Sequence, residues 1–108
     1  ALTAIYLATG QDTACVAENS IGHYQIEPLE DEVKFRLTLP SLTVGTVGGG
    51  TRLLAQHQNL KLLGCDTGDD ASKKFAEIIC ASALCLEISL FSAIASHTFT
   101  KAHMKYGR

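Results

Sequence analysis

The chain has 108 residues, which is enough for one domain with a single core but not for several. Its 46% hydrophobic and 19% charged residues are ordinary for a globular protein. A formal net charge of −2 gives no reason to expect a nucleic-acid partner, because such proteins carry strongly basic surfaces.

Residues 1 to about 19 are predicted to form one helix, because Leu2, Ile5 and Val16 recur at helical spacing. Gly10 weakens this helix, and a glycine in mid-helix usually marks a close packing contact. The segment has neither the basic start of a signal peptide nor a helix cap before it. We therefore expect the chain to be a piece of a longer protein that begins inside a helix.

A β-hairpin is predicted next, because residues 23–27 and 33–39 alternate between apolar and polar side chains. Residues 28–32, which end in Glu30-Asp31-Glu32, supply an acidic turn between the two strands. Pro40 marks the end of the second strand.

The glycine loop, which we define as Gly45-Thr46-Val47-Gly48-Gly49-Gly50-Thr51, comes before a second predicted helix over residues 51–63 that Gly64 ends. Glycine allows positive φ and lets another molecule approach the main chain closely. Exposed N–H groups at the start of the helix would favour an anionic or polar ligand. The loop matches neither the Walker pattern nor Gly-x-Gly-x-x-Gly, and adjacent glycines are also common in simple tight turns. Both interpretations stay open at this point.

A third helix is predicted over residues 71 to about 96, with its N-cap supplied by the polar turn at 66–70, and a short last helix over 99–106. Between residues 78 and 95 only Glu87 is charged, so the segment is nearly long enough to cross a membrane. A carboxylate in the middle of a span is costly in hydrocarbon. We therefore predict a central buried helix and no membrane segment, with Glu87 protonated, paired or facing a polar cleft.

The four cysteines form no Cys-x-x-Cys pair and no Cys/His cluster with the spacing of metal ligands. No metal site is predicted. Reduced and mostly buried thiols in a cytoplasmic protein are expected, because disulfides are rare in that compartment. The cysteines are Cys15, Cys65, Cys80 and Cys85.

Six short motifs, taken in order along the chain, resemble the C-terminal part of the catalytic domain of 3-hydroxy-3-methylglutaryl-coenzyme A (HMG-CoA) reductase. The glycine loop is most similar to the class I, NADPH-using branch of that family. The six motifs are Ala8-Thr9-Gly10-Gln11-Asp12, Leu39-Pro40-Ser41, the glycine loop, Leu62-Leu63-Gly64, Glu87-Ile88-Ser89-Leu90 and His103-Met104.

The resemblance implies an α+β fold, mostly helical with a β-hairpin, that forms part of the large substrate-binding domain. Residues 1–108 would be one piece of that domain, with no internal boundary. It also implies the reduction of HMG-CoA to mevalonate by two hydride transfers from NADPH, with release of coenzyme A. The sites of the family form in a homodimer or a higher homo-oligomer. Whether a membrane anchor lies upstream is left open.

The resemblance also implies roles for individual residues. Asp12 would tune a catalytic lysine, and His103 would protonate the departing coenzyme A thiolate, a step that suits imidazole. Cofactor contacts would come from Gln11, Gly48, Gly49, Gly50 and Arg108, and substrate or coenzyme A contacts from Ser89, Leu90 and Ala93. By residue type alone, Asp12 is more often a capping or solvated residue, and a histidine near a chain end is usually solvated.

Several parts of the family's machinery are missing from this sequence: the catalytic lysine, its partner glutamate and the Asp-Ala-Met-Gly-Met-Asn dinucleotide motif. Residues 18–22 only mimic the family's Glu-Asn-Val-Ile-Gly, at a different place in the order, and receive no role. The chain alone is therefore expected to be inactive.

The alternative is a non-catalytic helical interaction or assembly module that uses the third helix as its contact face. The enzyme hypothesis predicts that Asp12, His103 and the glycine loop converge on one cleft. The assembly hypothesis predicts that Asp12 and His103 lie far apart or point into solvent.

Overall fold

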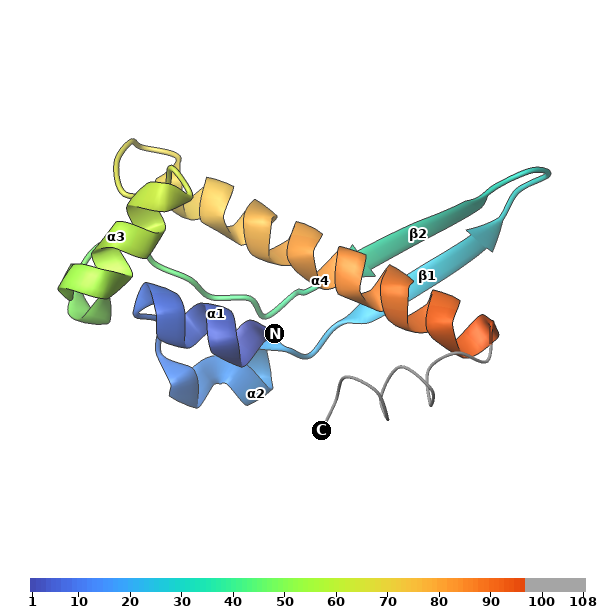
Figure 1. Cartoon of the computed structure of the whole chain (residues 1–108), viewed down its shortest axis with the longest axis horizontal. Helices are drawn as coiled ribbons and strands as arrows, with labels where there is room; N and C mark the ends of the chain where they lie inside the picture. Colours follow the sequence, from blue (N-terminus) through green and yellow to red (C-terminus); the bar gives the residue numbers. More distant parts are fainter. Residues whose placement is uncertain (97–108) are drawn as a thin grey trace.

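The computed structural model describes residues 1–96, which form a mainly helical arrangement with one projecting antiparallel hairpin (Figure 1). The predicted α+β class is confirmed. The predicted last helix over residues 99–106 lies outside the described residues. The elements in chain order are α1 (Leu2–Thr9), the 3-10 helix η1 (Thr13–Cys15), α2 (Val16–Asn19), β1 (His23–Pro28), β2 (Val33–Thr38), the 3-10 helix η2 (Gly49–Arg52), α3 (Leu54–Leu62) and α4 (Ala71–Ala95).

The first helix is shorter than predicted, because α1 ends at Thr9 and the expectation of one helix over residues 1 to about 19 was wrong. Gly10 has φ 74°, and its N–H donates to the carbonyl of Tyr6, which is the usual left-handed end of a helix. Asp12 then starts the short turn η1 by accepting a hydrogen bond from the N–H of Ala14. The chain therefore bends sharply at the Gly10–Asp12 turn.

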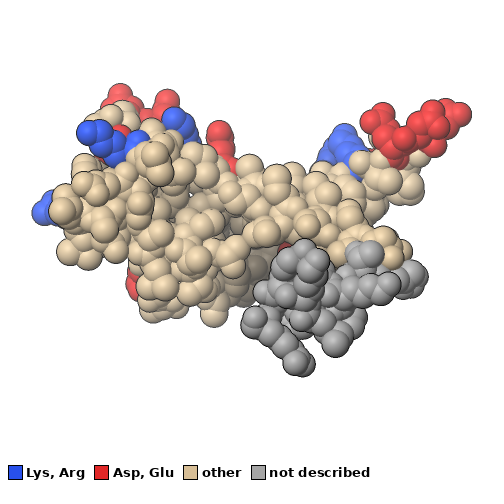
Figure 2. Space-filling view, in the orientation of Figure 1, with Lys and Arg blue, Asp and Glu red and all other residues tan. Residues whose placement is uncertain are grey.

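The hairpin forms as predicted, with β1 and β2 paired from His23 opposite Thr38 to Pro28 opposite Val33. It contacts α4 through aromatic rings, since Tyr24 and Phe91 meet edge to face with centroids 4.8 Å apart. Phe35 lies 6.4 Å from the same Phe91 ring. The acidic turn forms the far tip of the hairpin, and most charge on this face of the molecule gathers at the tip and at the opposite end (Figure 2).

The core lies where α1, α3 and the first turns of α4 meet. The fully buried side chains include Tyr6 from α1, Leu60 from α3 and Phe75 and Ile79 from α4, with Cys65 between α3 and α4. The second predicted helix is present, but η2 replaces its first turn, and Gly64 follows its end with φ 72° as expected. Val44, directly before the glycine loop, packs against this core, so the core supports the loop.

The third predicted helix matches α4 in length, but its expected burial was wrong. Only Ala71, Phe75 and Ile79 are buried, all near its start. Leu86 and Ile94 are each 51% exposed, because among the described residues the hairpin covers only one side of the later turns. Cys85 is also exposed, against the expectation of mostly buried thiols. Asp70 occupies the N-cap position without a side-chain hydrogen bond, so the predicted cap is absent there.

By length and composition α4 is also able to cross a membrane, with a mean hydropathy of 2.1 over its most apolar 18-residue window and 6% of that window buried. Core helices of soluble proteins meet the same two criteria. Glu87 lies within the apolar part of α4, and a charge at such a depth is expensive in lipid. The expectation of no membrane segment therefore stays a prediction.

A buried polar network joins α1 and α2 to the segment that leads into the glycine loop. The Tyr6 hydroxyl donates to Asn19 Oδ1 at 2.6 Å, and Asn19 Nδ2 donates to the Ser41 carbonyl at 2.8 Å. The N–H of Thr43 also donates to Asn19 Oδ1, at 3.3 Å. Asn19 belongs to the segment that received no role from the sequence, and the structure gives it a structural one.

Replacing Asn19 by Ala is expected to lower the free energy of unfolding by about 2–4 kcal/mol, because it leaves several buried polar groups without partners. Urea unfolding followed by circular dichroism measures this loss. The matched control is Ser20→Ala at the neighbouring exposed site, which should cost no more than about 0.5 kcal/mol. Similar losses in the two variants would contradict a structural role for the network.

Candidate functional site

The glycine loop and the Gly10–Asp12 turn face one open cavity of about 580 Å³, which we call the glycine-loop cavity. The sequence separates these two segments by more than thirty residues, as the hydrogen bonds of Gln11 to position 45 show. Tyr6, Leu7 and Gln56 complete parts of the wall from α1 and α3. The fold therefore brings Gln11, Asp12 and the three adjacent glycines to one place.

Gly10 and Gly50 meet main chain to main chain at the edge of this cavity. A Cβ added to Gly10 would lie 2.3 Å from the carbonyl carbon and oxygen of Gly50, and one added to Gly50 would lie 2.8 Å from the Gly10 oxygen. No side chain fits between the two segments. Gly50 is therefore required for packing within the chain, whatever else it contacts.

Gln11 holds the glycine loop through a reciprocal pair of hydrogen bonds. Its Nε2 donates to the Gly45 carbonyl at 2.9 Å, and its Oε1 accepts from the Gly45 N–H at 2.9 Å. Nε2 also donates to the Thr9 carbonyl at 3.1 Å. Both sides of the amide are thus engaged within the chain, so Gln11 positions the loop, and its cofactor contact stays a prediction.

Gly48 and Gly49 differ from Gly50 because a Cβ at either position would meet nothing within 4 Å. Their φ angles of 81° and 50° lie in the left-handed region, which glycine adopts without strain. The Thr51 N–H donates to the Gly48 carbonyl at 3.1 Å, and the Thr51 hydroxyl donates to the same oxygen. The turn interpretation is confirmed, and the turn leaves its main chain open to the cavity, while the ligand interpretation stays a prediction.

Asp12 is exposed at the cavity wall, and its two carboxylate oxygens have different partners. Oδ1 accepts from the Ala14 N–H at 2.9 Å, and Oδ2 accepts from the Cys15 thiol at 3.6 Å. Partial burial raises the pKa of the Cys15 thiol above its usual value, and the nearby Asp12 and Glu18 charges raise it further. Burial also raises the pKa of the Tyr6 hydroxyl, with a smaller contribution from Cys15.

The sequence model of the hydroxymethylglutaryl-coenzyme A reductase family matches residues 1–108, which is the entire chain. The chain belongs to this family. It is 48% identical over 105 residues to the 3-hydroxy-3-methylglutaryl-coenzyme A reductase of Methanocaldococcus jannaschii, covering 97% of this chain and 26% of that protein. With the reductase of Aeropyrum pernix it shares 45% identity over 111 residues, covering 99% and 26%.

A plant relative, reductase 2 of Gossypium hirsutum, is 42% identical over 114 residues, covering 99% of this chain and 18% of that protein. The chain thus spans about a quarter of the length of its archaeal HMG-CoA reductase relatives. The resemblance inferred from the six motifs is confirmed at the level of the family.

The predicted substrate and coenzyme A contacts, all three of which lie among the described residues, are not gathered at the glycine-loop cavity. Ser89 and Leu90 are exposed on the later turns of α4 and Ala93 is half-buried there, and none of the three lines that cavity. His103 and Arg108 lie outside the described residues. Asp12 and the glycine loop therefore line one cavity, whereas the functional roles of all the predicted site residues stay predictions.

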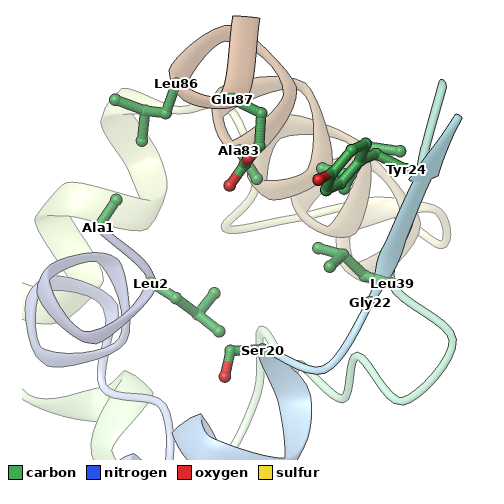
Figure 3. A pocket seen from close by; sticks show the side chains of 10 residues that line it. Ala1, Leu2, Ser20, Gly22, Tyr24, Leu39, Ala83, Leu86 and Glu87 are labelled. Carbon is green, nitrogen blue, oxygen red and sulfur yellow. The ribbon is translucent and has the colours of Figure 1, made fainter. Parts of the chain in front are cut away.

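A second cavity, of about 440 Å³, lies between the start of α1, the hairpin and α4 (Figure 3). Its walls are mainly apolar, with Leu2, Leu39 and Leu86 among them, and Glu87 is the one charged side chain of the described lining. Glu87 is half-buried, and Figure 3 shows its carboxylate directed toward the cavity. Of the three sequence alternatives for Glu87, the structure shows the one in which it faces a cleft, although the walls of that cleft are mostly apolar.

No group of three or more His, Cys, Asp and Glu side chains that could hold a metal occurs in residues 1–96. His57 and His23 are both exposed, as expected of surface residues. The sequence does carry a local signal for the turn at Gly10-Gln11-Asp12. Glycine is the preferred end of a helix and aspartate a preferred start, so these residues mark a boundary between two helical segments.

Proposed function

We propose that this chain is the C-terminal part of the catalytic domain of a class I-like HMG-CoA reductase. The complete enzyme would reduce HMG-CoA to mevalonate with NADPH, through two hydride transfers and the release of coenzyme A. The observation that carries the proposal is the shared cavity of Asp12 and the glycine loop, in a chain that matches the family throughout. A homodimer or higher homo-oligomer in the cytoplasm fits the same proposal.

The open main chain at Gly48 and Gly49 fits the close approach of NADPH, because no side chain fills the space above either residue. When bound, NADPH supplies the hydride. Gln11 would hold the loop at the correct distance through Gly45. The Asp-Ala-Met-Gly-Met-Asn motif does not occur in this sequence, so the cofactor would be held jointly with residues outside this chain.

Asp12 would act through its charge in this mechanism. A carboxylate beside a lysine keeps that lysine protonated, and a protonated lysine polarises a thioester or aldehyde oxygen. The lysine would come from outside this chain, since no lysine here matches the family's catalytic position. The exposed position of Asp12 at the cavity wall leaves room for such a partner.

His103 would protonate the departing thiolate, so we expect His103→Gln in the complete enzyme to slow the reduction of HMG-CoA by about 100-fold. Reduction of free mevaldehyde releases no thiolate and should keep most of its rate. NADPH oxidation measured with each of the two substrates separates the steps. His97→Gln is the matched control, and it should leave both rates near those of the unmodified enzyme. An equal loss on both substrates would exclude the proton-donor role.

The 108-residue chain alone is expected to produce no mevalonate and to associate. The catalytic lysine and its glutamate are missing, and the exposed Leu86, Leu90 and Ile94 on α4 leave an apolar surface open. An HMG-CoA-dependent assay of NADPH oxidation, together with light scattering on the purified chain, measures both properties. Ile94→Asp should reduce association without affecting the fold. Mevalonate production by a monomer would overturn our account of which residues are necessary.

A second candidate function is the non-catalytic assembly module, which the exposed apolar side of α4 favours. In that case Ile94→Asp would abolish the function of the complete protein, whereas Asp12→Asn would not affect it. The enzyme proposal expects Asp12→Asn to be the more harmful of the two.

A further inference from the structure

We propose that Cys15 is a positioning residue for Asp12, whose thiol fixes the orientation of the Asp12 carboxylate at the wall of the glycine-loop cavity. The inference rests on the proposed function for the role of Asp12, but the contact itself is independent of that function. The resemblance to the family did not assign any role to Cys15.

Two hydrogen bonds orient the Asp12 carboxylate at the Gly10–Asp12 turn. The Ala14 N–H binds Oδ1 at 2.9 Å and the Cys15 thiol binds Oδ2 at 3.6 Å, so each oxygen of the carboxylate has its own donor. Two donors on different oxygens restrict rotation of the carboxylate about its Cβ–Cγ bond. A carboxylate that must meet a lysine from another part of the enzyme benefits from such a fixed orientation.

Cys15 lies beside the Asp12 carboxylate. Cys15 ends η1, one turn after the Asp12 cap, and it is half-buried. The charged groups that raise the pKa of the Cys15 thiol are Asp12 and Glu18, and Cys15 in turn raises the pKa of Tyr6. The two acidic neighbours favour the neutral thiol, and only the neutral thiol has a proton to donate.

The direction of the pKa shift agrees with this geometry. Because the pKa of the Cys15 thiol is raised, the S–H donor persists at and above neutral pH and is lost only when the pH rises past that pKa. Thiolate would then face the Asp12 carboxylate and repel it.

The first test measures the contact in the 108-residue chain, without any need for activity. The rate of alkylation of Cys15 by iodoacetamide is followed against pH, with each cysteine resolved by peptide mass spectrometry. Asp12→Asn should shift the Cys15 profile to lower pH, and Glu18→Gln should shift it less, because Glu18 contributes charge but no hydrogen bond. Cys85, which is exposed, serves as the internal control. An unchanged Cys15 profile in Asp12→Asn would overturn the proposal.

The second test uses the complete enzyme. Cys15→Ala should lower kcat about fivefold, the effect expected from the loss of one hydrogen bond, with little change in KM. Cys15→Ser keeps a donor and should restore most of kcat. Equal losses in the two variants, or no loss in either, would overturn the positioning role. If Asp12→Asn shifts the alkylation profile but leaves turnover unchanged, the contact stands and the proposed function of Asp12 fails.

Discussion

Replacing Asp12 by Asn in the complete HMG-CoA reductase is expected to lower turnover by about 100-fold or more, with little loss of stability. Asparagine is also a good helix N-cap, and its side-chain oxygen can still accept the Ala14 N–H, so η1 should form as before. What disappears is the negative charge at the cavity wall. The catalytic lysine would then lack the carboxylate that keeps it protonated.

Steady-state rates of NADPH oxidation, together with urea unfolding of the same preparations, separate the catalytic effect from the structural one. The matched control is Asp31→Asn in the exposed turn between β1 and β2, which removes the same charge at a residue that does not line the cavity. Near-normal turnover in Asp12→Asn would remove Asp12 from the active site. A large fall in stability would instead mean that its capping role dominates.

The second large effect is expected from Gly10→Ala, which should lower the free energy of unfolding by more than about 3 kcal/mol. Alanine at this position would be strained because φ is 74°, and its Cβ would overlap the Gly50 carbonyl at 2.3 Å. The loop must move away from the end of α1 to make room. The cavity wall formed by both segments would then be lost.

Gly68→Ala provides the control for backbone strain alone, because Gly68 has φ 103° and nothing lies within 4 Å of an added Cβ. It should cost about 1–2 kcal/mol, clearly less than Gly10→Ala. Urea unfolding of the two variants gives the comparison. Equal costs would show that the close approach of Gly10 and Gly50 contributes nothing to stability.

Much of the fold was predictable because its signals are local. The alternation of apolar and polar residues gave the hairpin, and the boundaries of α3 and α4 were found to within a few residues. The break after Thr9 was also present locally, as glycine followed by a capping aspartate, but the apolar spacing of Leu2, Ile5 and Val16 favoured one continuous helix. In the structure the capping residues Gly10 and Asp12 override the apolar periodicity.

The candidate site was found only in part. The motifs predicted a site at Gly10-Gln11-Asp12 and the glycine loop, but they predicted the same cofactor-contacting role for all three adjacent glycines. The structure divides them, because Gly50 contacts Gly10 while Gly48 and Gly49 face open space. The two hydrogen bonds between Gln11 and Gly45 could not be predicted from the sequence, since the two residues are distant along the chain.

The family, the hairpin and the two helices after the glycine loop could all be predicted from the sequence. The long-range contacts could be seen only in the folded chain: the Gly10–Asp12 turn and the glycine loop line one cavity, Asn19 joins α1 and α2 to the segment that leads into the loop, and most of α4 is exposed. The reason is physical. Helix and strand periods and caps depend on near neighbours along the chain, whereas burial and contact depend on which distant segments the chain path brings together.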